Sequence, residues 1–211
     1  MAGLLVAKIS GRLAGDPNLP LWLEALTHWA GALVLAPGGG PFAAAVRGAQ
    51  RTMGLNDLAA HKMALLAIDQ YAIALATVRP SPTICATDDE LRAMMAQKRI
   101  AIWAPSRMAT VATDLPATWR ASSDSLAAWL AGRLGAAHLL LVKSVDAPSP
   151  ASTEGLSRRE LVDPMFPDFA TLAGCPITIA GPHALDGAAR LLAAGEMPGA
   201  RVTSLRQARA V

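Results

Sequence analysis

Two lysines come at the ends of short apolar segments that we expect to be buried strands. Lys8 lies near the end of residues 4–9, and Lys143 directly follows residues 138–142. An unpaired ammonium group is costly to bury, and in open α/β sheets ligands bind beyond the carboxyl ends of the strands. We therefore expect Lys8 and Lys143 to face each other there and to neutralise charge on a phosphate. The alternative is two solvated strand ends beside ordinary turns.

Glycines lie in two loops near these lysines. Gly11 follows Lys8 closely, and Gly38, Gly39 and Gly40 stand between two prolines after the apolar segment 32–35. Glycine lets an anion approach the backbone N–H groups, and the N-terminus of a following helix adds the positive end of its dipole. This pattern favours phosphate binding over a flexible turn. It is neither GxxxxGK[ST] nor GxGxxG.

A serine-rich segment with one carboxylate begins a predicted helix. Residues 122–125 read Ser-Ser-Asp-Ser and open the amphipathic segment 122–134. A helix N-cap needs only one such residue, so capping is the simple interpretation. The functional interpretation makes Asp124 a group that orients cationic side chains or a metal around a nucleotide.

Arg47 and Arg51 lie on the predicted helix that follows the glycine loop. They are four residues apart and therefore share one face, where they could hold an anionic acceptor through paired hydrogen bonds. A solvated helix face is the alternative. His61 lies on the next, apolar helix, where we expect a histidine satisfied within the core.

The composition excludes several classes of protein. Of the 211 residues 53% are hydrophobic and 17% are charged, so the chain as a whole is not disordered. The formal net charge is +3, and no run of Lys and Arg forms a stripe. We therefore expect no nucleic-acid partner.

Other segments bear on location. The apolar stretch 58–78 contains several polar residues and predicts a core helix, not a membrane span. The first ten residues are too short an apolar run for a signal peptide. Cys85 and Cys175 have no CxxC spacing and are expected to be buried thiols in a reducing compartment. Together these features predict a cytoplasmic protein without a membrane partner.

Predicted strands and helices alternate along the chain. This alternation favours a largely parallel sheet covered on both faces, and the all-apolar segment HLLLV agrees with burial on both sides. The predicted strands are residues 4–9, 32–35, 84–86, 99–104, 138–142, 177–180 and 201–203. The predicted helices are residues 19–31, 42–52, about 57–75, 90–97, 122–134 and 185–194, and residues 148–155 are predicted to be a loop.

In this order the elements resemble the amino acid kinase superfamily over nearly the whole chain. The resemblance is carried by the first lysine-and-glycine loop, Gly38-Gly39-Gly40, SDSLAAWLA, LLLVKSVD and GEMPGARVT. It implies an open three-layer αβα sandwich with a mainly parallel sheet of about eight strands. It also implies one domain, 1–211, with an acceptor-binding part at about 1–120 and a nucleotide-binding part at about 121–211. Members transfer the γ-phosphate of ATP to a carboxylate, phosphate or carbamate.

The same resemblance implies roles for individual residues. Lys8 and the glycines Gly11, Gly38, Gly39 and Gly40 would contact the transferred phosphoryl group, and Asp124 would organise the lysines. Arg47 and Ser123 would bind the acceptor, whereas Lys143, Ser144 and Asp146 would hold the nucleotide. ATP with Mg²⁺ and a homo-oligomeric state are expected on the same grounds.

Within the superfamily, the stretch PGGGPFAAAVRGAQRTMGLNDLAAHKMALLAIDQYA is the most informative. With TWRASSDSLAAWLA and LVKSVD, it resembles the small kinases of methanofuran biosynthesis and their methylotroph relatives. That resemblance implies conversion of an aminomethyl-furanmethyl phosphate to its diphosphate. AHKMALLA is more distantly similar to GDHMGMLA of uridylate kinases, but Ala60 replaces the aspartate, which argues against a uridine acceptor. The alternatives are a carboxylate kinase similar to acetylglutamate kinases, and a non-catalytic nucleotide- or oxyanion-binding protein on the same fold.

Overall fold

The structure is a computed structural model that describes residues 2–78 and 82–203. These residues contain an eight-stranded sheet in the order β3-β4-β2-β1-β5-β7-β8-β6. Neighbouring strands are parallel except β7 and β8, which are antiparallel. The predicted αβα fold with a mainly parallel, eight-stranded sheet is therefore confirmed. The strands are β1 (Leu5–Ile9), β2 (Leu33–Pro37), β3 (Thr83–Cys85), β4 (Ile100–Trp103), β5 (His138–Val142), β6 (Ala151–Ser152), β7 (Ile177–Ala180) and β8 (Ala200–Thr203).

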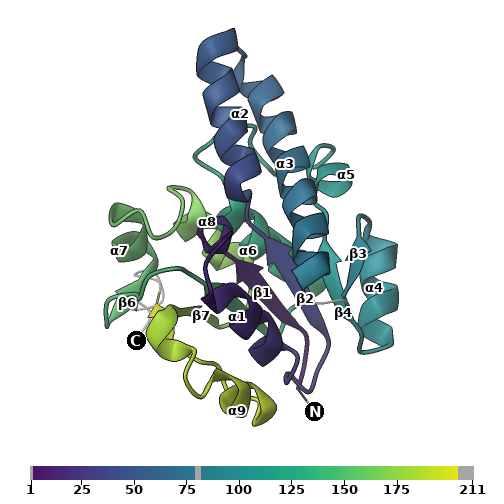
Figure 1. The fold of residues 1–211 in the computed structure, drawn as a ribbon, viewed down its shortest axis with the longest axis vertical. Helices are drawn as coiled ribbons and strands as arrows, with labels where there is room; N and C mark the ends of the chain where they lie inside the picture. The colour runs from purple at the N-terminus through teal and green to yellow at the C-terminus, as the bar shows by residue number, and fades with distance from the viewer. Residues whose placement is uncertain (1, 79–81, 204–211) are drawn as a thin grey trace.

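Helices cover both faces of this sheet (Figure 1). The core on one face lies under α1, α9 and the C-terminal half of α3, and the core on the other face lies under α4, α6 and α8 and includes Leu65 and Ile68 of α3. The helices are α1 (Asn18–Leu26), α2 (Gly40–Met53), α3 (Asp57–Val78), α4 (Asp88–Ala96), α5 (Ser106–Ala109), α6 (Ser123–Leu134), α7 (Thr153–Arg158), α8 (Phe166–Leu172) and α9 (Ala188–Ala193), with 3₁₀ turns η1 (Gly11–Leu13) and η2 (Pro182–Ala184).

Strand β1 shows how the two layers divide the side chains. Leu5, Ala7 and Ile9 belong to the core under α1, whereas Val6 belongs to the core under α6. Successive side chains of a strand point to opposite faces, so Lys8 points to the α6 side with Val6. The sheet therefore directs the first of the two lysines toward the start of α6.

The helices α2 and α3 form a pair that projects beyond one end of the sheet (Figure 1). The pair follows the carboxyl end of β2, which lies beside β1 in the centre of the sheet. Strand order reverses here, because β2 lies on one side of β1 and β5 on the other. Such a switch point opens a crevice for ligands in α/β sheets.

The element boundaries depart from the sequence expectations in several places. Strand β2 continues through Pro37 and α2 begins at Gly40, so the break between them is shorter than expected. Proline is tolerated at a strand end and in the first turn of a helix, where its missing N–H has no partner to lose. Helix α1 ends at Leu26 instead of Gly31, because the chain must turn back before β2.

The predicted loop at residues 148–155 also differs. It contains β6 and the beginning of α7, and the Ser152 side chain accepts a hydrogen bond from the Gly155 N–H at 3.1 Å. This serine is an N-cap, a signal that the dense Pro and Ser content of the segment obscured. The predicted strands at residues 138–142 and 177–180 match β5 and β7 without change.

Candidate active site

Three buried charges meet at the carboxyl ends of β1 and β5. Asp124 Oδ1 lies 2.8 Å from Lys8 Nζ and 2.6 Å from Lys143 Nζ. All three side chains are less than a tenth exposed. Lys8 comes from β1, Lys143 directly follows β5, and Asp124 lies in the first turn of α6. The two lysines thus converge on one carboxylate oxygen, although their sequence positions lie far apart.

The charges of this triad shift its proton affinities in opposing ways. Burial alone would raise the pKa of Asp124, but the attraction of Lys143 and Lys8 outweighs it and lowers that pKa to about 2. Burial lowers the pKa of Lys143 to about 8, against the attraction of Asp124. One carboxylate cannot neutralise two ammonium groups, so the fully charged triad carries a net positive charge. That charge suits an anionic ligand.

The start of α6 is held by a second carboxylate, Asp163. One of its oxygens accepts hydrogen bonds from Ser122 N–H (3.0 Å), Ser122 Oγ (3.1 Å) and Ser125 N–H (2.9 Å), and the other accepts from Ser125 Oγ. Burial, and then the charge of Asp124, raise the pKa of Asp163. Ser122 is the N-cap residue, but it makes no side-chain cap bond itself. Asp163 therefore caps the helix from outside and fixes the position of Asp124.

The two glycine loops are locked together backbone to backbone. A Cβ atom on Gly11 would lie 2.3 Å from the Gly40 nitrogen, and one on Gly38 would lie 2.5 Å from the Gly11 nitrogen. A Cβ on Gly39 would lie 2.2 Å from the Ala43 Cβ, and Gly40 has a φ of +54°. No L side chain fits at these contacts without movement of the backbone. The glycines thus let the loops after β1 and β2 meet at the cavity.

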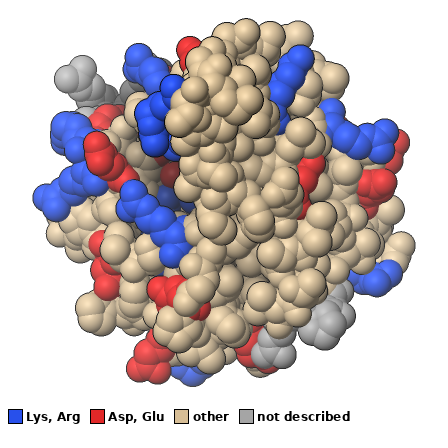
Figure 2. Space-filling view, turned by 45° about the horizontal axis from the view of Figure 1, so that its top comes forward, with Lys and Arg blue, Asp and Glu red and all other residues tan. Residues whose placement is uncertain are grey.

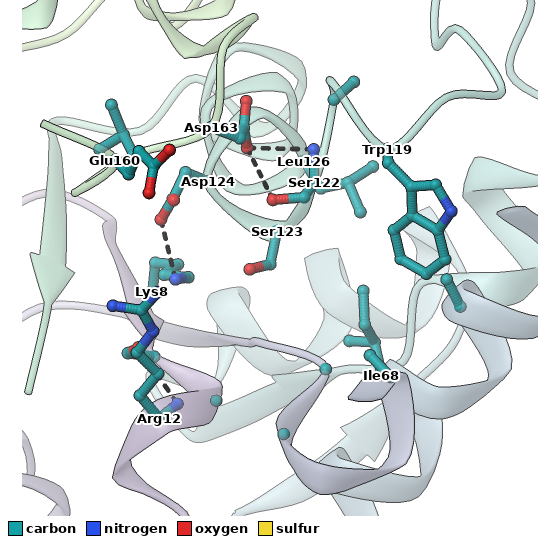
Figure 3. Close-up of a pocket in the computed structure, with 18 of the residues that line it drawn as sticks. Lys8, Arg12, Ile68, Trp119, Ser122, Ser123, Asp124, Leu126, Glu160 and Asp163 are labelled. Carbon is teal, nitrogen blue, oxygen red and sulfur yellow. Dashed lines mark hydrogen bonds and ion pairs between the residues drawn. The ribbon is translucent and has the colours of Figure 1, made fainter. Parts of the chain in front are cut away.

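A cavity of about 640 Å³ opens beside the triad and both loops. Figure 3 shows Lys8, Arg12, Asp124 and Glu160 gathered at one end, while Trp119, Ile68 and Leu126 lie at the other. We call these the polar end and the apolar end. In the space-filling view, Lys and Arg side chains with Asp and Glu among them lie on the left and on the right of a broad uncharged surface (Figure 2).

Most of the residues that the sequence singled out line this cavity. They are Lys8, Gly11, Gly39, Gly40, Arg47, Ser123, Asp124, Lys143 and Ser144.

Two of the predicted site residues do not line it. The Gly38 N–H donates to the Ile9 carbonyl at 2.8 Å and is not free for a phosphate. Asp146 accepts a hydrogen bond from the His183 backbone N–H at 3.1 Å and contacts His183 Nδ1 at 2.5 Å. The glycine at position 38 therefore serves the packing of the loops, and Asp146 ties the loop after β5 to η2.

The expected core position of His61 is wrong. His61 is half-buried and lines the cavity, and burial lowers its pKa. Arg51, predicted to share a site with Arg47, is exposed and does not line the cavity. The α2–α3 pair projects beyond the sheet, so a side chain on the apolar helix α3 can face a cavity instead of the core.

Sequence reasoning gave no role to Arg12, Trp119, Glu160 and Asp163. All four line the cavity. The only signal for Arg12 was its place one residue after Gly11. Nothing local marks the other three, because their partners or neighbours in the cavity come from distant segments.

The remaining expectations concern metals, thiols and membranes. Across residues 2–78 and 82–203, no group of three or more His, Cys, Asp or Glu side chains is placed so that it could hold a metal ion by itself. Cys85 is buried, Cys175 is half-buried, and both are free thiols. None of the described helices is both long and apolar enough to span a membrane.

The fold and this cavity define an α/β protein with a candidate ligand cavity at the switch point of a mainly parallel sheet. Residues 3–147 match the family model described as the amino acid kinase family. The chain belongs to the amino acid kinase family.

Individual relatives fit this assignment. A (5-(aminomethyl)furan-3-yl)methyl phosphate kinase of Methanocaldococcus jannaschii is 30% identical over 148 aligned residues, and the match covers 67% of this chain. The match spans 66% of that relative's length. The uridylate kinase of Archaeoglobus fulgidus has a similar structure, with a TM-score of 0.67 and 14% identity over 94% of this chain and 99% of that one. The structure of the UMP kinase of Ureaplasma parvum is also similar, with a TM-score of 0.66 and 13% identity over 96% of this chain and 100% of that one. At these identities the two solved structures support the fold alone.

Proposed function

We propose that this chain is an ATP-dependent kinase that phosphorylates a small phosphorylated acceptor. The specific proposal is an aminomethyl-furanmethyl phosphate, converted to its diphosphate in the biosynthesis of methanofuran or methylofuran. The observation that carries the proposal is the buried Lys8–Asp124–Lys143 triad beside the glycine loops. Family membership and the 30% identical furanylmethyl phosphate kinase support the reaction class and the acceptor.

Phosphoryl transfer asks the protein for positioning and charge more than for covalent chemistry. An oxygen of the acceptor phosphate attacks the γ-phosphorus of ATP, a new P–O bond forms, and the bond to the β-phosphate oxygen breaks to release ADP. The attacking oxygen is already ionised near neutral pH, so the reaction needs no general base. Lys8 and Lys143 stabilise the charge on the transferred group, and Asp124 holds both ammonium groups in place.

The glycine loops and the cationic side chains would contact different phosphates. Gly11, Gly39 and Gly40 admit a phosphate close to the backbone, because a Cβ would fill that space. Arg47 lies on α2 at the other side of the cavity and would hold the acceptor phosphate. Ser144 lines the cavity just after Lys143, where the nucleotide phosphates would enter.

Mg²⁺ fits this site as an ion that arrives with the nucleotide. Mg²⁺ usually takes one or two protein carboxylates and completes its shell with phosphates and water. Glu160 is the candidate ligand, because it lies at the polar end and no described residue hydrogen-bonds to its carboxylate. When bound, the ion would neutralise charge on the nucleotide phosphates.

The direct test supplies the purified chain with ATP, Mg²⁺ and the furan phosphate. We expect ADP and a diphosphate ester, read by ³¹P NMR, and we expect Asp124→Asn to stop their formation. Asp89→Asn, an exposed carboxylate on α4, is the matched control and should be unaffected.

Two other results would contradict this proposal. A product trapped by hydroxylamine, formed with a carboxylate acceptor, would identify an acyl phosphate and a carboxylate kinase. Nucleotide binding without turnover of any acceptor would identify a binding protein on the same fold.

The remaining sequence predictions belong to the same proposal. They are one kinase domain over residues 1–211 with acceptor and nucleotide parts, a homo-oligomer, and a cytoplasmic location. The domain and the oligomer rest on the family resemblance, and the location rests on the sequence alone.

A further inference from the structure

The apolar end of the cavity is built around Trp119. This residue lies between α5 and α6, is half-buried and lines the cavity. The other four tryptophans of the chain are buried and do not line it. Trp119 is thus the one tryptophan that a ligand in this cavity can touch.

A chain of hydrogen bonds fixes the indole ring. Trp119 Nε1–H donates to Gln50 Oε1 at 2.6 Å, and Gln50 Nε2–H donates to Asp57 Oδ1 at 2.9 Å. Gln50 lies on α2 and Asp57 begins α3. These hydrogen bonds therefore tie the loop that carries Trp119 to the projecting helix pair, so the indole ring has a defined orientation before a ligand binds.

Arg47 lies over the same ring. Its guanidinium carbon is 3.9 Å from the ring centroid, which is within the range of a cation–π contact. Partial burial lowers the pKa of Arg47. No described carboxylate forms a salt bridge with Arg47, so its charge is available to a ligand. The guanidinium lies over the indole ring, and Trp119 and Arg47 both line the cavity, so a ligand there can contact both side chains.

Aliphatic side chains complete the apolar end. Leu65 and Ile68 of α3 and Leu126 of α6 are almost fully buried and line the cavity. In Figure 3, Ile68 and Leu126 point to the same part of the cavity as Trp119. The space between them is walled by one aromatic ring and by branched aliphatic groups, a lining that suits a flat apolar body.

We infer that Trp119 is a specificity-determining residue that stacks on a planar, apolar group of the phosphorylated acceptor, and that it holds Arg47 ready for the acceptor's phosphate. This inference rests on the proposed function for the identity of the acceptor. It assigns the ring and the phosphate of one small molecule to two adjacent side chains. The polar end is then left to the nucleotide phosphates.

A binding experiment tests this without turnover. Calorimetry would compare benzyl phosphate, which is planar, with glycerol 3-phosphate, which is not, as ligands of the intact chain. We expect a Kd about tenfold lower for benzyl phosphate, as stacking on an aromatic side chain would give. The preference should vanish in Trp119→Ala, persist in part in Trp119→Phe, and fall in Gln50→Leu, where the ring loses its partner. Because the freed ring would also hold Arg47 less firmly, affinity for glycerol 3-phosphate should fall as well in Gln50→Leu, but less than affinity for benzyl phosphate.

Leu66→Ala is the matched control, because Leu66 is exposed on α3 and does not line the cavity. An equal preference in the unaltered chain and in Trp119→Ala would overturn the inference. The inference would also be overturned if Trp119→Ala changed the affinity for ATP and not the affinity for benzyl phosphate, because the indole would then bind the nucleotide base.

The outcomes separate this inference from the proposed function. Failure of the furan phosphate to give a diphosphate contradicts the proposed function, whereas loss of the ring preference contradicts the role of Trp119. Trp119→Phe keeps an aromatic ring in the same place, so it tests the role even if Trp119→Ala unfolds, which circular dichroism would show.

Discussion

The two ends of the cavity are built on different parts of the molecule. The polar end stands on strand termini and the first turn of α6, where buried charges are held at 2.6–2.8 Å. The apolar end stands largely on the projecting α2–α3 pair and the segment before α6, where Arg47 is exposed and Trp119 is half-buried. Changes at the polar end disturb buried charges, whereas changes at the apolar end alter only local contacts. The comparison predicts that chemistry is fixed by the sheet and acceptor choice by the projecting helices.

The largest effect is expected for Asp124→Ala. Loss of this carboxylate leaves two buried ammonium groups unpaired, so we expect turnover to be abolished. Breaking a buried ion pair costs about 3–5 kcal/mol, and the free energy of unfolding should fall accordingly. Steady-state kinetics and urea unfolding monitored by circular dichroism measure the two effects. Activity near that of the unaltered chain would contradict the assignment of the polar end.

The second-largest effect is expected for Lys8→Ala, as a decrease in kcat. Removing one group that stabilises transition-state charge typically lowers kcat about 10²–10³-fold. The fold should persist, because Asp124 keeps Lys143 as a partner. Lys62→Ala, an exposed lysine of α3 outside the cavity, is the control in the same assay. A loss shared by both variants would point to a general effect of charge.

Arg47→Ala tests the other end. A hydrogen bond to a charged group contributes about 1.5–3 kcal/mol, so KM for the acceptor should rise roughly 10- to 100-fold while KM for ATP changes little. Arg51→Ala lies one turn further along α2 and should leave both constants unchanged, because Arg51 does not line the cavity. Equal increases in both KM values would mean that Arg47 serves the nucleotide and that the two ends are not separate in function.

The smallest effect is expected for the pH dependence of kcat/KM that Lys143 causes. Burial lowers the pKa of Lys143 to about 8, so its ammonium form is lost as the pH rises through that value. We expect kcat/KM to decline above pH 8, and Lys143→Arg to move this decline to higher pH. In the unfolded chain Lys143 keeps its proton up to about pH 10.5, whereas in the folded chain it loses it near pH 8. The free energy of unfolding should therefore rise with pH between pH 8 and 10.5. A flat profile in the unaltered chain would contradict a catalytic ammonium at Lys143.

Local signals predicted much of the polar end. Lys8 and Lys143 stood out because charged residues are rare beside buried strands, and Asp124 stood out at a helix start. Asp163 could not be predicted, because its partners Ser122 and Ser125 lie 41 and 38 residues away. The same holds for Trp119, whose hydrogen-bond partner Gln50 is 69 residues away.

The sequence by itself determined the alternation of strands and helices, the parallel sheet and the residue types at the strand ends. Continuous apolar runs and glycine loops are local patterns, so they could be recognised without the fold. Only the tertiary structure decided which charges meet. Strand order puts β1 beside β5, and the pleat turns Lys8 toward α6, so both lysines reach one oxygen of Asp124. The tertiary structure also decided that Gly38 and Asp146 do not line the cavity, because their hydrogen-bond partners, Ile9 and His183, lie elsewhere along the chain.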